Sequence, residues 1–181
     1  MIKPIRNYLV KPLGQGFVTE KDGIIINTGI ENHKYTNRYA ELLSKPIHDD
    51  SELMVGDICI VHHNCFRTYY DMKGKQRKSA EYFRNNTYLI PEEKMYLYKR
   101  NEVWKPIKDY CFISPVSYSQ QDDVYVPKEE EEHVGHVRFG NSDNFKQGDL
   151  VGYRKNREYE FDIDGEKLYR MRIKDILVNL S

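Results

Sequence analysis

The sequence predicts an all-β protein made of two tandem small antiparallel β barrels. Three observations favour this fold class: the residues that form strands are abundant, helical periodicity is weak, and the chain contains an internal repeat. The 181 residues include 15 tyrosines, and valine, isoleucine and tyrosine recur in short runs, which favours strands over helices. Glycine, asparagine, aspartate and proline separate these runs, as short strands joined by turns require. Single turns of helix fit only residues 40–43 and 79–84, and neither segment is long enough to stand alone.

The repeat divides the chain into two halves. Three segments of the first half return in the same order in the second half: residues 3–10 as 105–112, residues 55–58 as 147–150, and residues 94–97 as 175–178. Three matches in one order indicate a duplication. We therefore expect one domain at residues 1–100 and a second, diverged domain at residues 104–181, separated where charged residues interrupt two apolar runs.

A Gly-Asp pair precedes an apolar run in each copy, as Gly56-Asp57 and as Gly148-Asp149. Glycine permits a positive φ, and the aspartate side chain can accept hydrogen bonds from the backbone amides that follow it. The chain is therefore expected to reverse at these pairs before it enters the core again. This pattern supports the fold class and not a particular function.

An apolar triplet, Ile24–Ile26, bears most directly on function. It lies between Gly23 and Gly29, with Asn27 and Thr28 behind it. Such a triplet is either a short buried strand or an apolar plug held out for another protein. The surrounding repeat, with its Gly-Asp pairs and its similar closing strands, favours the plug.

Taken together, these features resemble the GroES-type co-chaperonins, the small β-barrel lids of chaperonin rings, in a tandem and diverged form. Four segments resemble the family's first strand, its mobile loop, its Val-Gly-Asp-Ile-Val-Ile segment and its closing strand: residues 3–6, 22–29, 55–60 and 175–178. The resemblance implies that the first domain carries a mobile loop at about residues 18–33. A long insert at about residues 65–86 departs from the family pattern, and this departure favours a phage lineage over a plastid one.

The resemblance implies a function as a co-chaperonin that caps a GroEL-type chaperonin ring and assists ATP-dependent protein folding. The loop would place its apolar triplet in a groove between two helices of the ring's apical domain. ATP would be bound by the chaperonin, and no cofactor is expected for this chain. A ring-shaped homo-oligomer is implied, with a heptamer favoured. The implied chaperonin-binding residues are Gly23, Ile24, Ile25, Ile26, Asn27, Thr28 and Gly29.

The second copy offers a candidate second loop at the equivalent position, with Val124, Tyr125 and Val126. This segment lacks glycine, and four glutamates follow it at residues 129–132. A solvated connection is therefore favoured there, and the first domain is expected to carry the working contact.

The insert interleaves basic and aromatic residues, a pattern that often binds single-stranded nucleic acid. Residues 71–75 also fit a hairpin tip with solvated charges, and this interpretation is favoured, so nucleic acid is not an expected partner. His62, His63 and Cys65 lie where the insert begins. Because adjacent residues of a strand face opposite sides, the two histidines are not expected to share a metal ion. A pair at the end of a loop, without a role as metal ligands, is favoured.

Composition excludes several other classes. The 28 basic and 28 acidic residues cancel, which argues against a dedicated nucleic-acid or membrane-surface binder. No run approaches the roughly 20 apolar residues that crossing a membrane requires, and the first residues lack the pattern of a signal peptide. An odd number of cysteines indicates reduced thiols and a cytoplasmic protein.

No catalytic set of residues is present, so an enzyme is not expected. Two other functions stay open: a non-chaperone interaction or phage-assembly module on the same barrel, and a nucleic-acid-binding β barrel.

Overall fold

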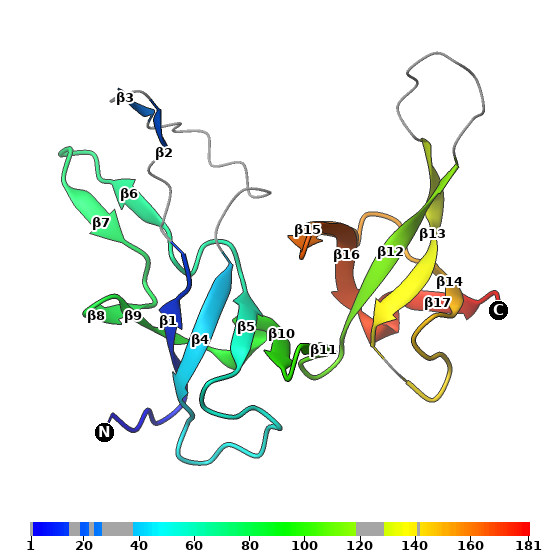
Figure 1. The fold of residues 1–181 in the computed structure, drawn as a ribbon, viewed down its shortest axis with the longest axis horizontal. Helices are drawn as coiled ribbons and strands as arrows, with labels where there is room; N and C mark the ends of the chain where they lie inside the picture. Colours follow the sequence, from blue (N-terminus) through cyan, green and yellow to red (C-terminus); the bar gives the residue numbers. More distant parts are fainter. Residues whose placement is uncertain (1, 15–18, 22–23, 27–37, 119–128, 141) are drawn as a thin grey trace. The chain divides into compact units, whose positions relative to one another are not determined.

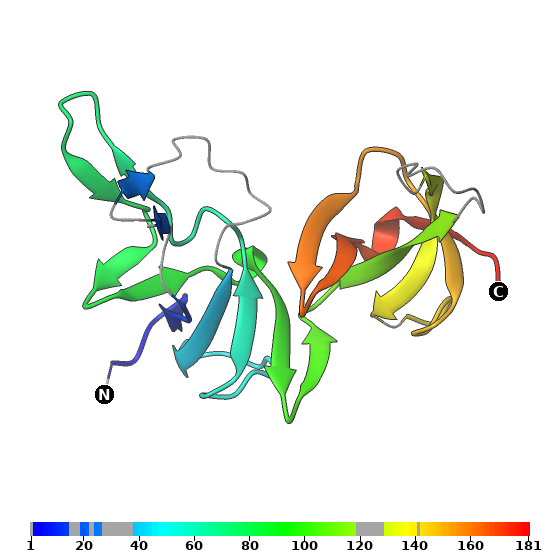
Figure 2. The same ribbon diagram turned by 45° about the horizontal axis from the view of Figure 1, so that its top comes forward.

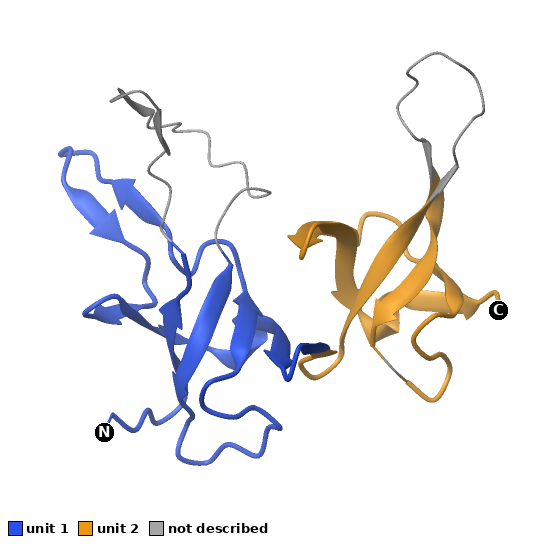
Figure 3. Ribbon diagram, viewed as in Figure 1, with its two compact units in different colours: residues 1–104 blue, residues 105–181 orange. Residues whose placement is uncertain are grey.

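The computed structural model describes residues 2–14, 19–21, 24–26, 38–118, 129–140 and 142–181. Regular structure in this part of the chain consists of strands and two short 3-10 turns, Glu92–Lys94 and Ile173–Asp175, with no α-helix. The predicted all-β class with antiparallel sheets is confirmed. The chain divides into two compact units, Met1–Trp104 and Lys105–Ser181 (Figure 3).

Unit 1 contains a seven-stranded antiparallel sheet with the order β11-β10-β5-β4-β1-β9-β8 (Figure 1). Its strands are β1 (Tyr8–Pro12), β4 (Tyr39–Ser44), β5 (Ile58–Val61), β8 (Tyr82–Arg84), β9 (Thr87–Ile90), β10 (Met95–Arg100) and β11 (Val103–Pro106). Two further pairs of strands form separate two-stranded sheets: β2 (Thr19–Lys21) with β3 (Ile24–Ile26), and β6 (Thr68–Tyr70) with β7 (Gln76–Lys78).

Unit 2 contains a six-stranded antiparallel sheet with the order β15-β16-β12-β13-β14-β17 (Figure 2). Its strands are β12 (Tyr110–Tyr118), β13 (Glu129–Phe139), β14 (Leu150–Tyr153), β15 (Tyr159–Ile163), β16 (Glu166–Arg172) and β17 (Ile176–Asn179).

The two main sheets share one strand order. Strands β1, β4, β5, β8, β9 and β10 of unit 1 take the same places as β12, β13, β14, β15, β16 and β17 of unit 2. A 3-10 turn precedes β10 in unit 1 and β17 in unit 2. Unit 1 differs by the edge strand β11 and by the β2–β3 and β6–β7 pairs, which have no counterpart among the described strands of unit 2.

The core of unit 1 shows the period of two that strands impose. In β4, Ala40 and Leu42 are buried, whereas the residues between and beside them are partly exposed. The single helical turn that residues 40–43 could form is therefore not present, because alternate burial on a sheet outweighs local helix propensity. At residues 79–84 a β-turn leads into β8, so the second possible helical turn is not present either.

The core of unit 2 is built on aromatic and aliphatic side chains from both faces of its sheet. Phe112 makes edge contacts with Phe139 and Phe161, with ring centroids 6.3 and 5.6 Å apart. A second buried cluster comprises Cys111, Ile113, Val137, Phe145, Val151, Tyr153 and Met171. Burial of this set is the main source of stability for a sheet of this size.

The Gly-Asp turn of unit 1 is fixed by four hydrogen bonds. Gly56 N donates to Leu42 O at 2.8 Å, and Leu42 N donates to Asp57 O at 2.9 Å. Asp57 N donates to Met54 O at 3.0 Å, and Met54 N donates to Asp57 Oδ2 at 2.7 Å. The aspartate side chain thus binds a preceding amide, not the following ones that the sequence pattern suggests.

Unit 2 repeats this turn bond for bond. Gly148 N donates to Val137 O at 2.8 Å, and Val137 N donates to Asp149 O at 2.9 Å. Asp149 N donates to Lys146 O at 3.2 Å, and Lys146 N donates to Asp149 Oδ2 at 3.0 Å. Gly148 has φ +94°, as has Gly56, and this conformation favours glycine over residues with a Cβ. The predicted reversal before β5 and before β14 is confirmed at both pairs.

Candidate partner-binding face

The Ile24–Ile26 triplet belongs to the connection between β1 and β4. These strands are antiparallel neighbours, with Pro12 at the end of β1 opposite the start of β4. Leu13 N donates to Tyr39 O at 2.9 Å, which closes the base of the connection. Neighbouring antiparallel strands need only a two-residue turn between them, yet residues 13–38 intervene here. The sheet alone does not require a connection of this length.

Within this connection the triplet forms β3, which pairs with β2 in a two-stranded antiparallel sheet. Thr19 lies opposite Ile26, and Lys21 lies opposite Ile24. The triplet is therefore extended, but it is not a strand of the seven-stranded sheet of unit 1. The other candidate residues of this segment lie outside the described residues: Gly23, Asn27, Thr28 and Gly29.

The equivalent connection of unit 2 joins β12 to β13, which pair up to Tyr118 opposite Glu129. Its candidate residues Val124, Tyr125 and Val126 lie outside the described residues. The four glutamates that follow, residues 129–132, begin β13, so the acidic run belongs to a strand and its interpretation as a solvated connection is wrong.

The β1–β4 connection and the insert leave the seven-stranded sheet at the same end. Pro12 at the end of β1 pairs with Ala40 in β4, and Tyr39 pairs with Ile60 near the end of β5. Tyr88 near the start of β9 pairs with Val10 in β1. The chain therefore departs into residues 13–38 and into the insert from one end of the sheet. It enters the sheet again from the insert through β8, in which Tyr82 pairs with Tyr88 of β9.

The insert forms a hairpin of its own, in which Tyr69 of β6 lies opposite Arg77 of β7. Its tip is closed by Asp71, whose Oδ1 accepts hydrogen bonds from Lys73 N and Lys75 N at 2.9 Å each. Asp71 N also donates to Lys75 O at 2.9 Å, and Gly74 has φ +72°. The hairpin tip predicted at residues 71–75 is confirmed.

Every residue of β6 and β7 in this hairpin is exposed to solvent. Tyr69 and Tyr70 are 44% and 59% exposed, and Met72 at the tip is fully exposed. Asp71 Oδ2 accepts a hydrogen bond from Arg77 Nε at 2.9 Å. The hydrogen bond from the Lys75 amide, together with those from Arg77 and the Lys73 amide, lowers the pKa of Asp71.

The base of the hairpin is attached to the core of unit 1. Cys65 is fully buried, and its carbonyl accepts a hydrogen bond from Ser79 Oγ at 2.5 Å. Phe66 packs edge-on against Tyr88, with ring centroids 4.9 Å apart. Glu81 forms an ion pair with Lys94 of the 3-10 turn before β10. Unit 1 therefore holds the hairpin where the chain enters it, near Cys65, and where the chain leaves it, near Glu81.

The histidine pair differs from its expected arrangement. His62 and His63 follow the end of β5, so the alternation of a strand does not apply to them, and their rings stack with centroids 4.2 Å apart. The prediction that they face opposite sides is wrong, whereas their position beyond the end of the strand agrees with the favoured loop-end pair. Among the described residues, no group of three or more His, Cys, Asp or Glu side chains is arranged to hold a metal ion.

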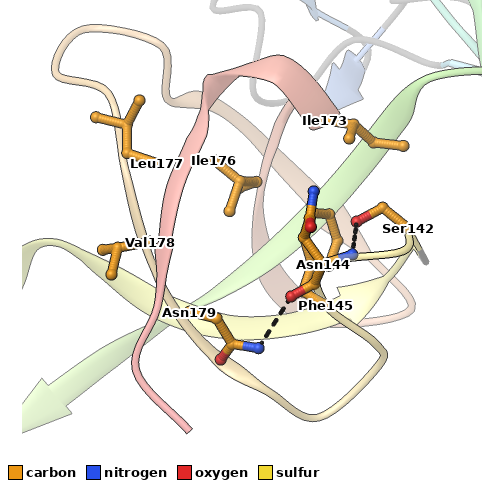
Figure 4. Close-up of a pocket in the computed structure, with 8 residues that line it drawn as sticks. All are labelled: Ser142, Asn144, Phe145, Ile173, Ile176, Leu177, Val178 and Asn179. Atoms are coloured by element: carbon orange, nitrogen blue, oxygen red, sulfur yellow. Dashed lines mark hydrogen bonds between the residues drawn. The ribbon is translucent and has the colours of Figure 1, made fainter.

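A pocket in unit 2 lies between the loop after β13 and the strand β17 (Figure 4). Asn144 N donates to Ser142 Oγ at 3.2 Å, and Asn179 Nδ2 donates to Asn144 O at 3.1 Å. The eight lining residues include no acid, base or thiol. The Ser142 hydroxyl therefore has no base among the lining residues that could activate it as a nucleophile.

No protein-family model matches this chain, and a search of the curated proteins finds no match. In the part of the chain that the structure describes, no helix has the length and apolar character to span a bilayer.

Proposed function

We propose that this chain is a co-chaperonin: a tandem of two GroES-like barrels, one of which caps a GroEL-type chaperonin ring through the Ile24–Ile26 triplet. The observation that carries this proposal is the position of the triplet. It lies in a two-stranded sheet of its own, on a connection between neighbouring strands that the seven-stranded sheet does not need. A partner can therefore bind this segment without removing a strand from the core sheet.

The shared strand order and the matched Gly-Asp turns support the duplicated-barrel part of the proposal. In this account the second unit is a diverged copy that preserves the sheet. The first unit carries the triplet and therefore the working contact. Seven such chains in one ring present seven triplets, and a phage lineage accounts for the insert.

The proposed cycle follows from the physics of a loop that binds through a few apolar residues. Ordering the loop against a groove costs conformational entropy, so a single contact has moderate affinity and is reversible. Several loops on one ring act together, and their combined avidity exceeds that of any one loop. The chaperonin binds and hydrolyses ATP, and this chain closes the chamber and is released with each nucleotide cycle.

The triplet can be tested with Ile25→Asp. Burial of a carboxylate in an apolar groove is costly, so the variant should not comigrate with a chaperonin ring and ATP in size-exclusion chromatography. Ile5→Asp is the matched control, because Ile5 is 73% exposed and precedes β1 at the other end of that strand from residues 13–38. We expect this control to bind like the wild type, with far-UV circular dichroism unchanged in both variants. Loss of the fold in Ile25→Asp would favour a buried core strand instead.

A further inference from the structure

We propose that the β6–β7 hairpin is a second docking element, which binds an acidic protein surface beside the groove that receives the triplet. This inference rests on the proposed function, because it assigns the hairpin to the same chaperonin partner. It rests on four features of unit 1: the charge of the insert, its exposure, its attachment to the sheet, and the end of the sheet from which it projects.

The insert concentrates positive charge in a chain whose charges balance overall. Residues 65–86 contain six basic and two acidic side chains, whereas the whole chain contains 28 of each. The basic residues of the insert are Arg67, Lys73, Lys75, Arg77, Lys78 and Arg84. All six residues are exposed to solvent. A segment with this charge fits an acidic surface and is repelled by a basic one.

Both acidic side chains of the insert are engaged in holding the hairpin in place. Asp71 binds the tip amides and Arg77 Nε, and Glu81 pairs with Lys94 outside the insert. The tip lysines contribute their backbone amides to the turn, and their side chains belong to the exposed class. The hairpin therefore presents its basic side chains on a preformed support, which reduces the ordering cost of binding.

The position of the hairpin points to the same partner as the triplet. The β-ladder register places the departures into residues 13–38 and into the insert at one end of the seven-stranded sheet. Unit 2 joins the equivalent strands β14 and β15 through residues 154–158, without a hairpin. The insert thus occurs in the unit that carries the triplet.

The aromatic side chains favour a protein surface over single-stranded nucleic acid as the occupant. Cations of the insert already lie over three of its rings: Arg67 over Tyr69, Lys78 over Tyr82 and Arg84 over Phe83, at 5.8, 3.9 and 4.9 Å from the centroids. Base stacking needs an accessible ring face, and one face of each of these rings is occupied.

The test is a double charge reversal, Lys73→Glu with Lys75→Glu, compared with Lys146→Glu and Lys155→Glu. The control pair lies in exposed positions of unit 2 and changes the net charge equally. Binding to a chaperonin ring with ATP is measured at about 50 and 200 mM salt. We expect the tip variant to bind about tenfold more weakly at low salt and to lose most of the salt dependence. The control should stay within about twofold of the wild type.

The outcomes separate the two proposals. If the wild type does not bind the ring, the proposed function fails, and this inference fails with it. If the wild type binds and the tip variant shows the same affinity and salt dependence, the hairpin contact is overturned while the capping function stands. Tight binding of the wild type to a single-stranded oligonucleotide, abolished in the tip variant, would overturn the choice of an acidic protein surface. Circular dichroism and the melting temperature confirm that each variant is folded.

Discussion

Arg100 forms a bidentate ion pair with Asp57, with Nε donating to Oδ1 at 2.8 Å and Nη2 donating to Oδ2 at 2.6 Å. Asp57 is 4% exposed, and its Oδ2 also accepts a hydrogen bond from the Met54 amide. The pair ties the last residue of β10 to the turn before β5. In unit 2 the corresponding Asp149 accepts a hydrogen bond from the uncharged Asn179 side chain at 3.1 Å.

We expect Asp57→Ala to lower the free energy of unfolding of unit 1 by about 2–4 kcal/mol, because it removes three hydrogen bonds, two of them to a cation. Asp149→Ala removes hydrogen bonds from uncharged donors at a more exposed position. The free energy of unfolding of unit 2 should therefore fall by about 1 kcal/mol. Urea unfolding measures both losses, with the fluorescence of Trp104, the chain's one tryptophan, reporting on unit 1. Equal losses in the two variants would show that the ion pair adds nothing.

The same carboxylate makes the stability of unit 1 sensitive to acid. Burial raises the pKa of Asp57, and the hydrogen bonds from Arg100 and from the Met54 amide outweigh this effect, so the pKa is lowered. A lowered pKa in the folded state stabilises the fold above the unfolded pKa and loses this effect as the pH falls through the folded value.

The free energy of unfolding should therefore be steady from neutral pH down to about pH 5 and fall below about pH 4. Asp49 and Glu81 also have lowered pKa values, so Asp57→Ala should weaken the acid dependence without removing it. Urea midpoints measured across this range test the prediction. An identical pH profile in wild type and variant would contradict the role of Asp57.

The turn in unit 2 depends on the backbone freedom of Gly148. No atom lies within 4 Å of the Cβ that an alanine would add there, and φ is +94°. Gly148→Ala should therefore destabilise unit 2 through backbone strain alone, by about 1–2 kcal/mol. Gly148→Asn should lower the stability of unit 2 by less, since asparagine tolerates positive φ better than alanine does. Urea unfolding followed by circular dichroism ranks the two, and an equal loss would rule out backbone strain as the cause.

The three cysteines are predicted to be unreactive in the folded protein. All are fully buried, and burial raises the pKa of Cys65 and of Cys111 to about 12 and raises that of Cys59 further. Because the thiolate is the reactive form, a colorimetric thiol reagent at about pH 8 should label no thiol before urea is added and three afterwards. Rapid labelling of Cys65 in the native protein would contradict the anchored base of the β6–β7 hairpin.

Local sequence patterns predict the features of this fold that depend on neighbouring residues. The strand composition, the two Gly-Asp reversals and the tip at residues 71–75 each follow from the conformational preferences of a few consecutive residues. The single helical turn that residues 40–43 could form is not present because burial in β4 is decided by the neighbouring strands and not by those four residues. The prediction that the two histidines face opposite sides was wrong because β5 ends at Val61, directly before the pair.

Contacts between distant residues could not be predicted in this way. The Asp57–Arg100 pair joins residues that are 43 positions apart, and no local pattern marks either one as the partner of the other. The triplet is visible in the sequence as an apolar run between glycines. Its relation to the insert depends on the register of β1, β4, β5 and β9, which the sequence does not specify. The candidate residues were thus predictable. That residues 13–38 and the insert leave the sheet at the same end was not.

The account is tested most directly by hydrogen–deuterium exchange of residues 18–33, measured with and without a GroEL-type ring and ATP. The co-chaperonin proposal predicts rapid exchange of these amides in the free protein and marked protection in the complex. Strands β1, β4 and β5 should exchange slowly in both states. Residues 119–128 serve as an internal comparison and should gain no protection if unit 1 carries the working loop. Equal exchange of residues 18–33 in the two states, with or without binding elsewhere on the chain, would contradict the central claim.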